Sequence, residues 1–137
     1  MDQTGTYVKI MRESLERKQN YLTEILQLTN SQAVLANAEK FDEDEFASIV
    51  DRKDMLIGNI NEIDKGFSSV YDRVRSEIQS NPAAYREDLK TVQQLIRTCV
   101  DLGMPIEAAE ERNRAVMVLV FSAKFKGVRQ MKQSKSV

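Results

Sequence analysis

Residues 41–46 read Phe-Asp-Glu-Asp-Glu-Phe, a stretch with several signals for the start of a helix. Asp42 is a good N-cap residue, and Glu45 stands three residues later, at the position that completes a capping box. Phe41 and Phe46 flank the box at the two positions of a hydrophobic staple. The stretch therefore predicts a tight turn followed by a helix that begins at residue 42.

The residues that follow predict a long amphipathic helix over 42–80. Apolar residues recur there at alternating spacings of three and four, which places them on one face. Only Lys53 interrupts this face. The apolar positions are Phe46, Ile49, Leu56, Ile60, Ile63, Phe67, Val70, Val74 and Ile78.

Residues 6–38 carry a similar stripe, in which Lys18, Thr29 and Gln32 occupy the polar positions. A helix of this length, about 45 to 50 Å at about 1.5 Å per residue, needs a partner for its apolar face. The short connection after it makes the two helices antiparallel, so that residues whose numbers sum to about 80 face each other. We therefore expect a long, coiled-coil-like helical hairpin.

This register predicts partners for the two lysines in the seam. Lys18 is expected to face Glu62, and Lys53 to lie near Glu24 and Gln27. Two interpretations stay open: the lysines reach these acceptors and help to set the register, or they only lie at the edge of the seam.

A third helix is expected over 82–102. Asn81 is a good N-cap and Pro82 suits the first helical position. An apolar stripe follows and includes Cys99, which we interpret as a small buried hydrophobe rather than a reactive thiol.

A fourth helix is expected over 105–132, with a basic tail at 133–137. Gly103 and Pro105 form the predicted break between it and the preceding helix. The 137 residues include only five glycines and two prolines, which favours helix throughout. The sequence thus predicts a single all-α domain over 1–137, a bundle-like arrangement of the hairpin and two further helices.

The composition excludes many kinds of active site. The chain has no histidine, which removes the Ser-His-Asp triad, the Cys-His dyad and His-ligated zinc. The five glycines are isolated from each other, so the sequence contains no Gly-rich phosphate loop. We expect the protein not to be an enzyme and to bind no cofactor or metal.

The expected location is the cytoplasm. A single cysteine cannot form an internal disulfide, which fits a reducing compartment. The N-terminus lacks the pattern of a signal peptide, and the longest nearly apolar run, 115–123, is shorter than the roughly 20 residues of a membrane span. No stable membrane insertion is expected.

Charge is distributed unevenly along the chain. The net charge is −1, but seven basic residues and no acidic ones follow Glu111, so residues 1–111 carry −8. This asymmetry fits an interaction tail, and it equally fits cations placed at the C-terminal end of a last helix. Because the remainder is acidic and would repel phosphate backbones, nucleic-acid binding is not expected.

Residues 115–121 form an apolar run on all sides of the expected last helix. One interpretation is that at least half of these side chains pack into the core of the bundle. The other is a surface for a protein partner or for self-association, with Met117 and Phe121 as its anchors.

Residues 49–57 read IVDRKDMLI, and residues 60–67 read INEIDKGF. These segments resemble FlgN-type flagellar export chaperones, which often show a lysine between polar residues, then Leu-Ile, then Ile-x-x-Leu/Ile-Asp. The resemblance extends to residues 22–26 and 111–113, and in outline it covers almost the whole chain. The chain departs from the family in its valine-rich final segment and in the turn at 103–105.

The resemblance implies a cytoplasmic chaperone without ATPase activity, which binds hook-filament junction subunits and prevents their premature assembly before type III export. The implied partners are these protein clients and components of the export apparatus. The alternative is a self-associating helical structural or interaction protein, a homo-oligomer. In the family the C-terminal region is associated with substrate binding, which implies a partner-binding site at Val116, Met117, Leu119, Val120, Phe121 and Phe125.

Overall fold

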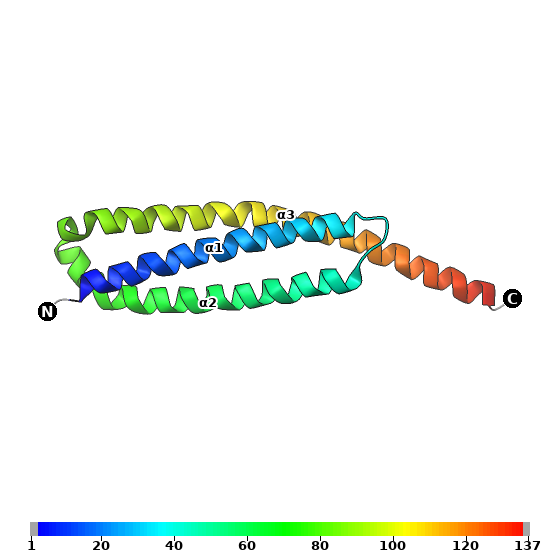
Figure 1. Cartoon of the computed structure of the whole chain (residues 1–137), viewed down its shortest axis with the longest axis horizontal. Coiled ribbons are helices and arrows are strands. Elements are labelled where there is room, and N and C mark those ends of the chain that lie inside the picture. Colours follow the sequence, from blue (N-terminus) through cyan, green and yellow to red (C-terminus); the bar gives the residue numbers. More distant parts are fainter. Residues whose placement is uncertain (1–2, 136–137) are drawn as a thin grey trace.

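The computed structural model describes the backbone of residues 3–135 and the side chains of residues 3–120 and of Ser122. Three long α-helices and one short 3-10 helix make up almost all of this part of the chain (Figure 1). The predicted all-α, bundle-like fold is confirmed. The elements are α1 (Thr4–Ala36), α2 (Glu43–Ser80), η1 (Pro82–Tyr85) and α3 (Arg86–Lys135).

Helix α1 is the central element of the bundle. It packs along both α2 and α3, whereas α2 and α3 hardly approach each other. Figure 1 shows α1 between the other two helices, and it shows α3 continuing well beyond the end of the bundle. The bundle is therefore open along the side between α2 and α3.

The turn between α1 and α2 has the predicted N-cap and hydrophobic staple. The backbone N–H of Glu45 donates to Oδ1 of Asp42 at 3.0 Å. The rings of Phe41 and Phe46 pack with their centroids 5.4 Å apart. The cap and the staple together fix the point at which α2 begins.

The alanine variant Asp42→Ala is expected to lose about 1 kcal/mol of unfolding free energy, because it removes the side-chain acceptor of the cap. Urea denaturation followed by circular dichroism measures this loss. The matched control is Asp51→Ala, which removes an exposed carboxylate from the interior of the same helix. Equal losses in the two variants would mean that the Asp42 hydrogen bond does not stabilise the start of α2.

The predicted antiparallel register of α1 and α2 is confirmed. Near the N-terminus, Val8 and Met11 pack against Val74 and Ile78. Further along the hairpin, Ile25, Leu56 and Ile60 form a second buried cluster.

The predicted partners of the seam lysines are wrong. Nζ of Lys18 donates to Oδ1 of Asp64 at 2.7 Å, because Lys18 lies on the side of the seam that faces α3. Glu62 lies on the opposite side, in a hollow between α1 and α2. Glu24 pairs with Arg52 instead of Lys53, and the hydrogen bond from Arg52 lowers the pKa of the Glu24 carboxyl.

The predicted break at 103–105 is also wrong, since the expected helices 82–102 and 105–132 form one continuous helix after the short η1. Pro105 lies inside α3 and is exposed to solvent. An internal proline costs a helix about 3 kcal/mol, but Ala109 and Asn113 beyond it are buried and hold the helix on the bundle. Figure 1 shows α3 changing direction after its yellow part, as internal prolines often cause.

The end of α3 differs from the prediction as well. The helix extends to Lys135 rather than ending at about residue 132. Most of the expected basic tail at 133–137 is thus helical, and residues 136–137 lie outside the described part of the chain.

Candidate functional site

An apolar groove runs between α2 and α3, with α1 as its floor. Its widest part, near the α1–α2 turn, encloses about 640 Å³. The apolar groups here remain open to solvent because α2 and α3 are too far apart to cover them. The apolar lining residues are Leu22 and Ile25 of α1, Phe46, Val50, Ile57 and Ile60 of α2, and Ile106 and Met117 of α3.

The groove continues toward the middle of the bundle. A second hollow of about 340 Å³ shares Leu22 and Ile60 with the first. On the α3 side it is lined by Ile96, Cys99 and Val100, of which Ile96 and Val100 are exposed. Three helices thus leave open the position that a fourth helix would occupy in a four-helix bundle.

Polar side chains from all three helices meet at the floor of the groove. Nζ of Lys53 donates to Oε1 of Gln32 at 2.7 Å and also to Oε1 of Glu110. The hydroxyl of Thr29 lies 3.1 Å from the same Glu110 oxygen, and Nδ2 of Asn113 donates to the backbone carbonyl of Thr29 at 2.8 Å. We call these five residues the polar cluster.

The polar cluster joins α2 to α3 where their backbones do not meet. Lys53 is only 8% exposed and is the one charged residue in the buried class among the described residues. A buried ammonium group is tolerated when it is paired and hydrogen-bonded, which Glu110 and Gln32 achieve together. The cluster therefore fixes the position of α3 relative to the hairpin.

The sequence did not reveal the roles of Glu110 and Asn113. A signal was present, because the spacing of three and four continues without interruption through Pro105. The residues at this spacing are Val92, Ile96, Cys99, Gly103, Ile106, Glu110, Asn113 and Met117.

The predicted partner-binding residues lie at the end of the groove and on the part of α3 beyond it. Met117 lines the groove. Val116 and Val120 are partly buried, whereas Leu119 is 69% exposed. The side chains of Phe121 and Phe125 lie outside the described residues. The described part of the apolar run is thus divided between the groove, which Met117 lines, and the surface, where Leu119 lies.

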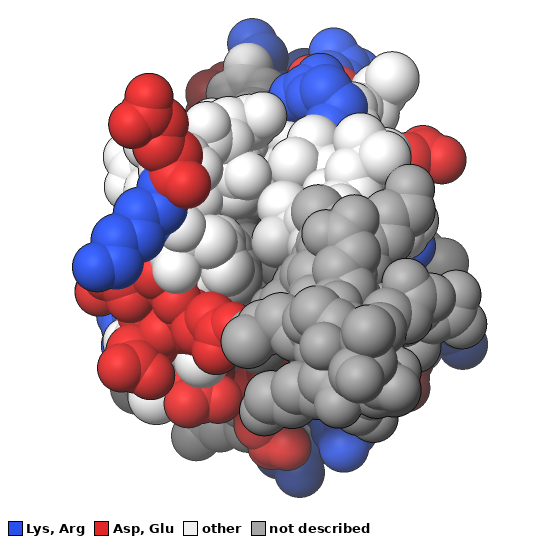
Figure 2. Space-filling view, turned by 90° about the vertical axis from the view of Figure 1, so that its right-hand side faces the viewer, with Lys and Arg blue, Asp and Glu red and all other residues white. Residues whose placement is uncertain are grey.

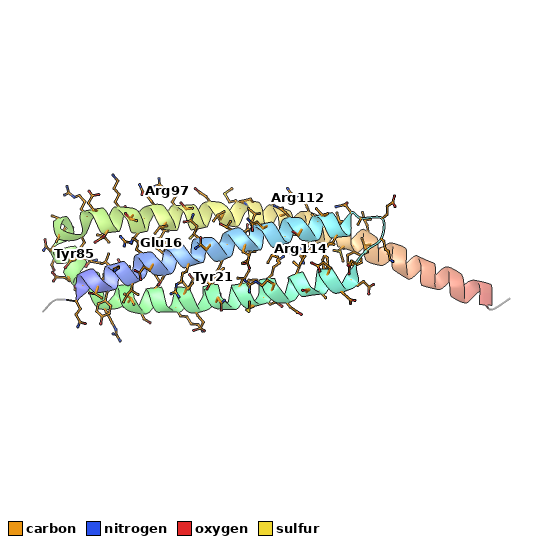
Figure 3. All side chains as sticks on the ribbon, in the orientation of Figure 1. Glu16, Tyr21, Tyr85, Arg97, Arg112 and Arg114 are labelled. Carbon is orange, nitrogen blue, oxygen red and sulfur yellow. The ribbon has the colours of Figure 1, made fainter. Side chains whose placement is uncertain are left out.

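Charged groups lie at the mouth of the groove. Asp54 of α2 and Arg114 of α3 both line it, and neither forms an ion pair or hydrogen bond with another described residue. Arg112, two positions before Arg114, projects from the outer side of α3 (Figure 3). An occupant of the groove would therefore meet one free charge of each sign.

The end of the bundle that carries the α1–α2 turn is strongly acidic. Figure 2 looks onto this end and shows Asp and Glu side chains gathered on one side, next to a continuous uncharged area. The exposed acidic residues of the turn are Glu39, Asp42, Glu43, Asp44 and Glu45.

Cys99 is buried, as predicted, and its Sγ lies 3.9 Å from the carbonyl oxygen of Leu15. Burial raises the pKa of the Cys99 thiol, which keeps it in the poorly nucleophilic protonated form.

Within the part of the chain that the structure describes, no three His, Cys, Asp or Glu residues converge as a metal site. In the same part, no helix has an apolar stretch long enough to cross a membrane.

No protein-family model, curated protein or solved structure matches this chain. The resemblance to FlgN-type chaperones therefore stays a prediction from the sequence.

Proposed function

We propose that this protein is a cytoplasmic export chaperone of the FlgN type, and that it holds an amphipathic helix of a hook-filament junction subunit in the groove between α2 and α3. Bound in this way, the subunit helix would be kept from assembling before type III export. Neither catalysis nor nucleotide hydrolysis is part of this role.

The observation that carries the proposal is the open apolar groove. From Phe46 to Ile60 the α2 wall is about 21 Å long at about 1.5 Å per residue, enough for about four turns of a bound helix. Helices commonly bind such grooves through apolar residues spaced three and four apart. The choice of client in this proposal comes from the sequence resemblance. The proposed mode of binding comes from the shape and the apolar lining of the groove.

Two features would help the groove to select its client helix, namely the polar cluster and the exposed end of α3. The polar cluster interrupts the apolar floor, so a matching client helix would place a polar or small residue over Glu110 and Asn113. Leu119 and Val120 extend the apolar surface beyond the groove. Release would follow from competition by the export apparatus, the second partner that the resemblance implies.

The test is co-purification with the hook-filament junction subunits of the source organism, after co-expression of each with this protein. The wild type is expected to retain at least one of them, and Val120→Asp is expected to lose it because it buries a carboxylate in the contact. The matched control is Ser122→Asp, which adds the same charge at an exposed polar position two residues away and should retain the client.

Circular dichroism should show unchanged helicity and melting for both variants. Failure of the wild type to retain any of these subunits would contradict the proposed function. Loss of folding in Val120→Asp would instead place Val120 in the core of the bundle.

A further inference from the structure

We infer that the helix held in the groove carries a basic side chain on the flank that faces α2 and an acidic side chain on the flank that faces α3. Such a helix would pass between Asp54 and Arg114, the two charges at the mouth of the groove. We rest this inference on the proposed function, in which the groove holds a helix of a client protein.

Among the described residues, four charged side chains line the widest part of the groove, as an inner pair and an outer pair. The inner charges, Lys53 and Glu110, meet over the floor and neutralise each other. The outer charges, Asp54 of α2 and Arg114 of α3, are exposed and form no ion pair with another described residue. The mouth therefore presents a negative charge on its α2 wall and a positive charge on its α3 wall.

The two outer charges lie at similar levels along the bundle. The residue before Arg114 donates to the backbone carbonyl of Thr29 on α1 at 2.8 Å. The residue before Asp54 donates to the side chain of Gln32 on α1 at 2.7 Å. These two contact points are three residues apart, or about 4.5 Å at about 1.5 Å per residue, which is less than one helical turn. A helix that lies over this part of α1 therefore meets both charges at once.

Apolar wall residues surround the outer charges. Val50 and Ile57 lie one turn to either side of Asp54, and Met117 lies one turn after Arg114. A bound helix that covers these apolar residues also removes water from the two charges beside them. Loss of water without a new partner is unfavourable for a charged group. An occupant with complementary charges on its flanks is therefore favoured over one with neutral or like charges.

This arrangement predicts a pattern in the sequence of the occupant. At about 100° per residue, residues two or five positions apart lie about 160° or about 140° apart around a helix, which places them on the two flanks of a buried stripe. The occupant should thus have its basic and acidic residues two or five positions apart, beside apolar residues at spacings of three and four. Because the two walls carry opposite charges, the pair also selects one of the two directions in which the helix can lie.

The test uses four synthetic helices of about 18 residues, long enough to span the groove. They share a leucine stripe at spacings of three and four and differ only at two flank positions five residues apart. These positions hold Lys and Glu in the mixed probe, two Lys in the basic probe, two Glu in the acidic probe and two Gln in the neutral probe. Fluorescence anisotropy measures the dissociation constant of each probe for the full-length protein in about 0.15 M salt. We expect the mixed probe to bind about tenfold more tightly than the basic or the acidic probe.

Single charge reversals at the mouth should change this preference in opposite directions. In Arg114→Glu both outer charges are negative, so the basic probe should bind about tenfold more tightly than the mixed probe. In Asp54→Lys both outer charges are positive, so the acidic probe should bind most tightly. Both positions are exposed, so circular dichroism should show the helicity of the wild type. The comparison of the four probes on the wild type does not require either variant.

The matched controls are Arg112→Glu and Asp51→Lys, which make the same charge changes at exposed positions that do not line the groove. Arg112 projects from the outer side of α3 (Figure 3), and Asp51 lies on α2 three positions before Asp54. Both controls should keep the wild-type order of the four probes.

Three results would overturn the inference. One is the absence of binding of all four probes to the wild type. Another is an equal affinity of the mixed, basic and acidic probes. The third is the same change of order in Arg112→Glu as in Arg114→Glu.

These failures are distinct from a failure of the proposed function. If the probes show no charge preference but hook-filament junction subunits still co-purify with the protein, the inference is wrong and the proposed function stands. If the predicted preference is found but no such subunit is retained, the proposed function is wrong and the groove binds a helix of this chemistry from another protein.

Discussion

Lys53→Ala is expected to lower the free energy of unfolding by about 3 kcal/mol, the lower end of the range for breaking a buried ion pair. The variant removes the ammonium group that joins Gln32 of α1 to Glu110 of α3. Glu110 is then left with a carboxylate that is only partly solvated, its side chain being 35% exposed. We expect the variant to weaken mainly the packing of α3 against the hairpin, because the polar cluster connects α3 to α2.

Urea denaturation followed by circular dichroism measures this effect. The matched control is Lys65→Ala on the same helix, whose only described ion pair is an exposed contact of 3.9 Å with Glu62 and which should change stability by less than about 0.5 kcal/mol. The double variant Lys53→Met, Glu110→Met should regain at least half of the loss, since apolar replacements leave no unpaired charge. Equal stabilities of Lys53→Ala and Lys65→Ala would show that the polar cluster does not stabilise the bundle.

Ile57→Asp is expected to weaken client binding by at least about 30-fold, or about 2 kcal/mol, while the protein stays folded. Ile57 lines the groove and is 45% exposed in the free protein. A bound helix would cover this position and leave the new carboxylate without water or a partner. Titration calorimetry with a purified client measures the change.

The control for Ile57→Asp is Met55→Asp, two residues away. Met55 is 49% exposed, nearly as much as Ile57, but it does not line the groove. Its substitution should leave the affinity within about twofold, as expected for a site outside the contact. Similar losses in both variants would mean that the client does not bind in the groove.

The hairpin could be predicted from the sequence because its signals are local or periodic. Asp42 and Phe41 act within one turn of helix, and the three-four spacing determines which residues of α1 and α2 are buried. The continuity of α3 could not be predicted in the same way. Gly103 and Pro105 are local signals for a break, and they are outweighed by the burial of Ala109 and by the hydrogen bond from Asn113 to Thr29 of α1.

The candidate site could be predicted only in part. Met117, which lines the groove, was among the residues predicted as anchors, because an apolar run without an amphipathic pattern stands out in a sequence. The α2 wall of the groove was missed, although Val50 and Ile57 each follow a seam residue and widen the apolar stripe. Their role depends on the distance between α2 and α3, which follows from how α3 packs and not from the pattern of α2 alone.

Amide hydrogen exchange with and without a hook-filament junction subunit tests most directly whether a client helix lies between α2 and α3. We expect added protection in residues 46–60 and 106–120 on client binding. We expect no change in residues 62–70 of α2, which border the separate hollow between α1 and α2. A client that binds but protects only residues 62–70, or neither wall of the groove, would contradict binding between α2 and α3.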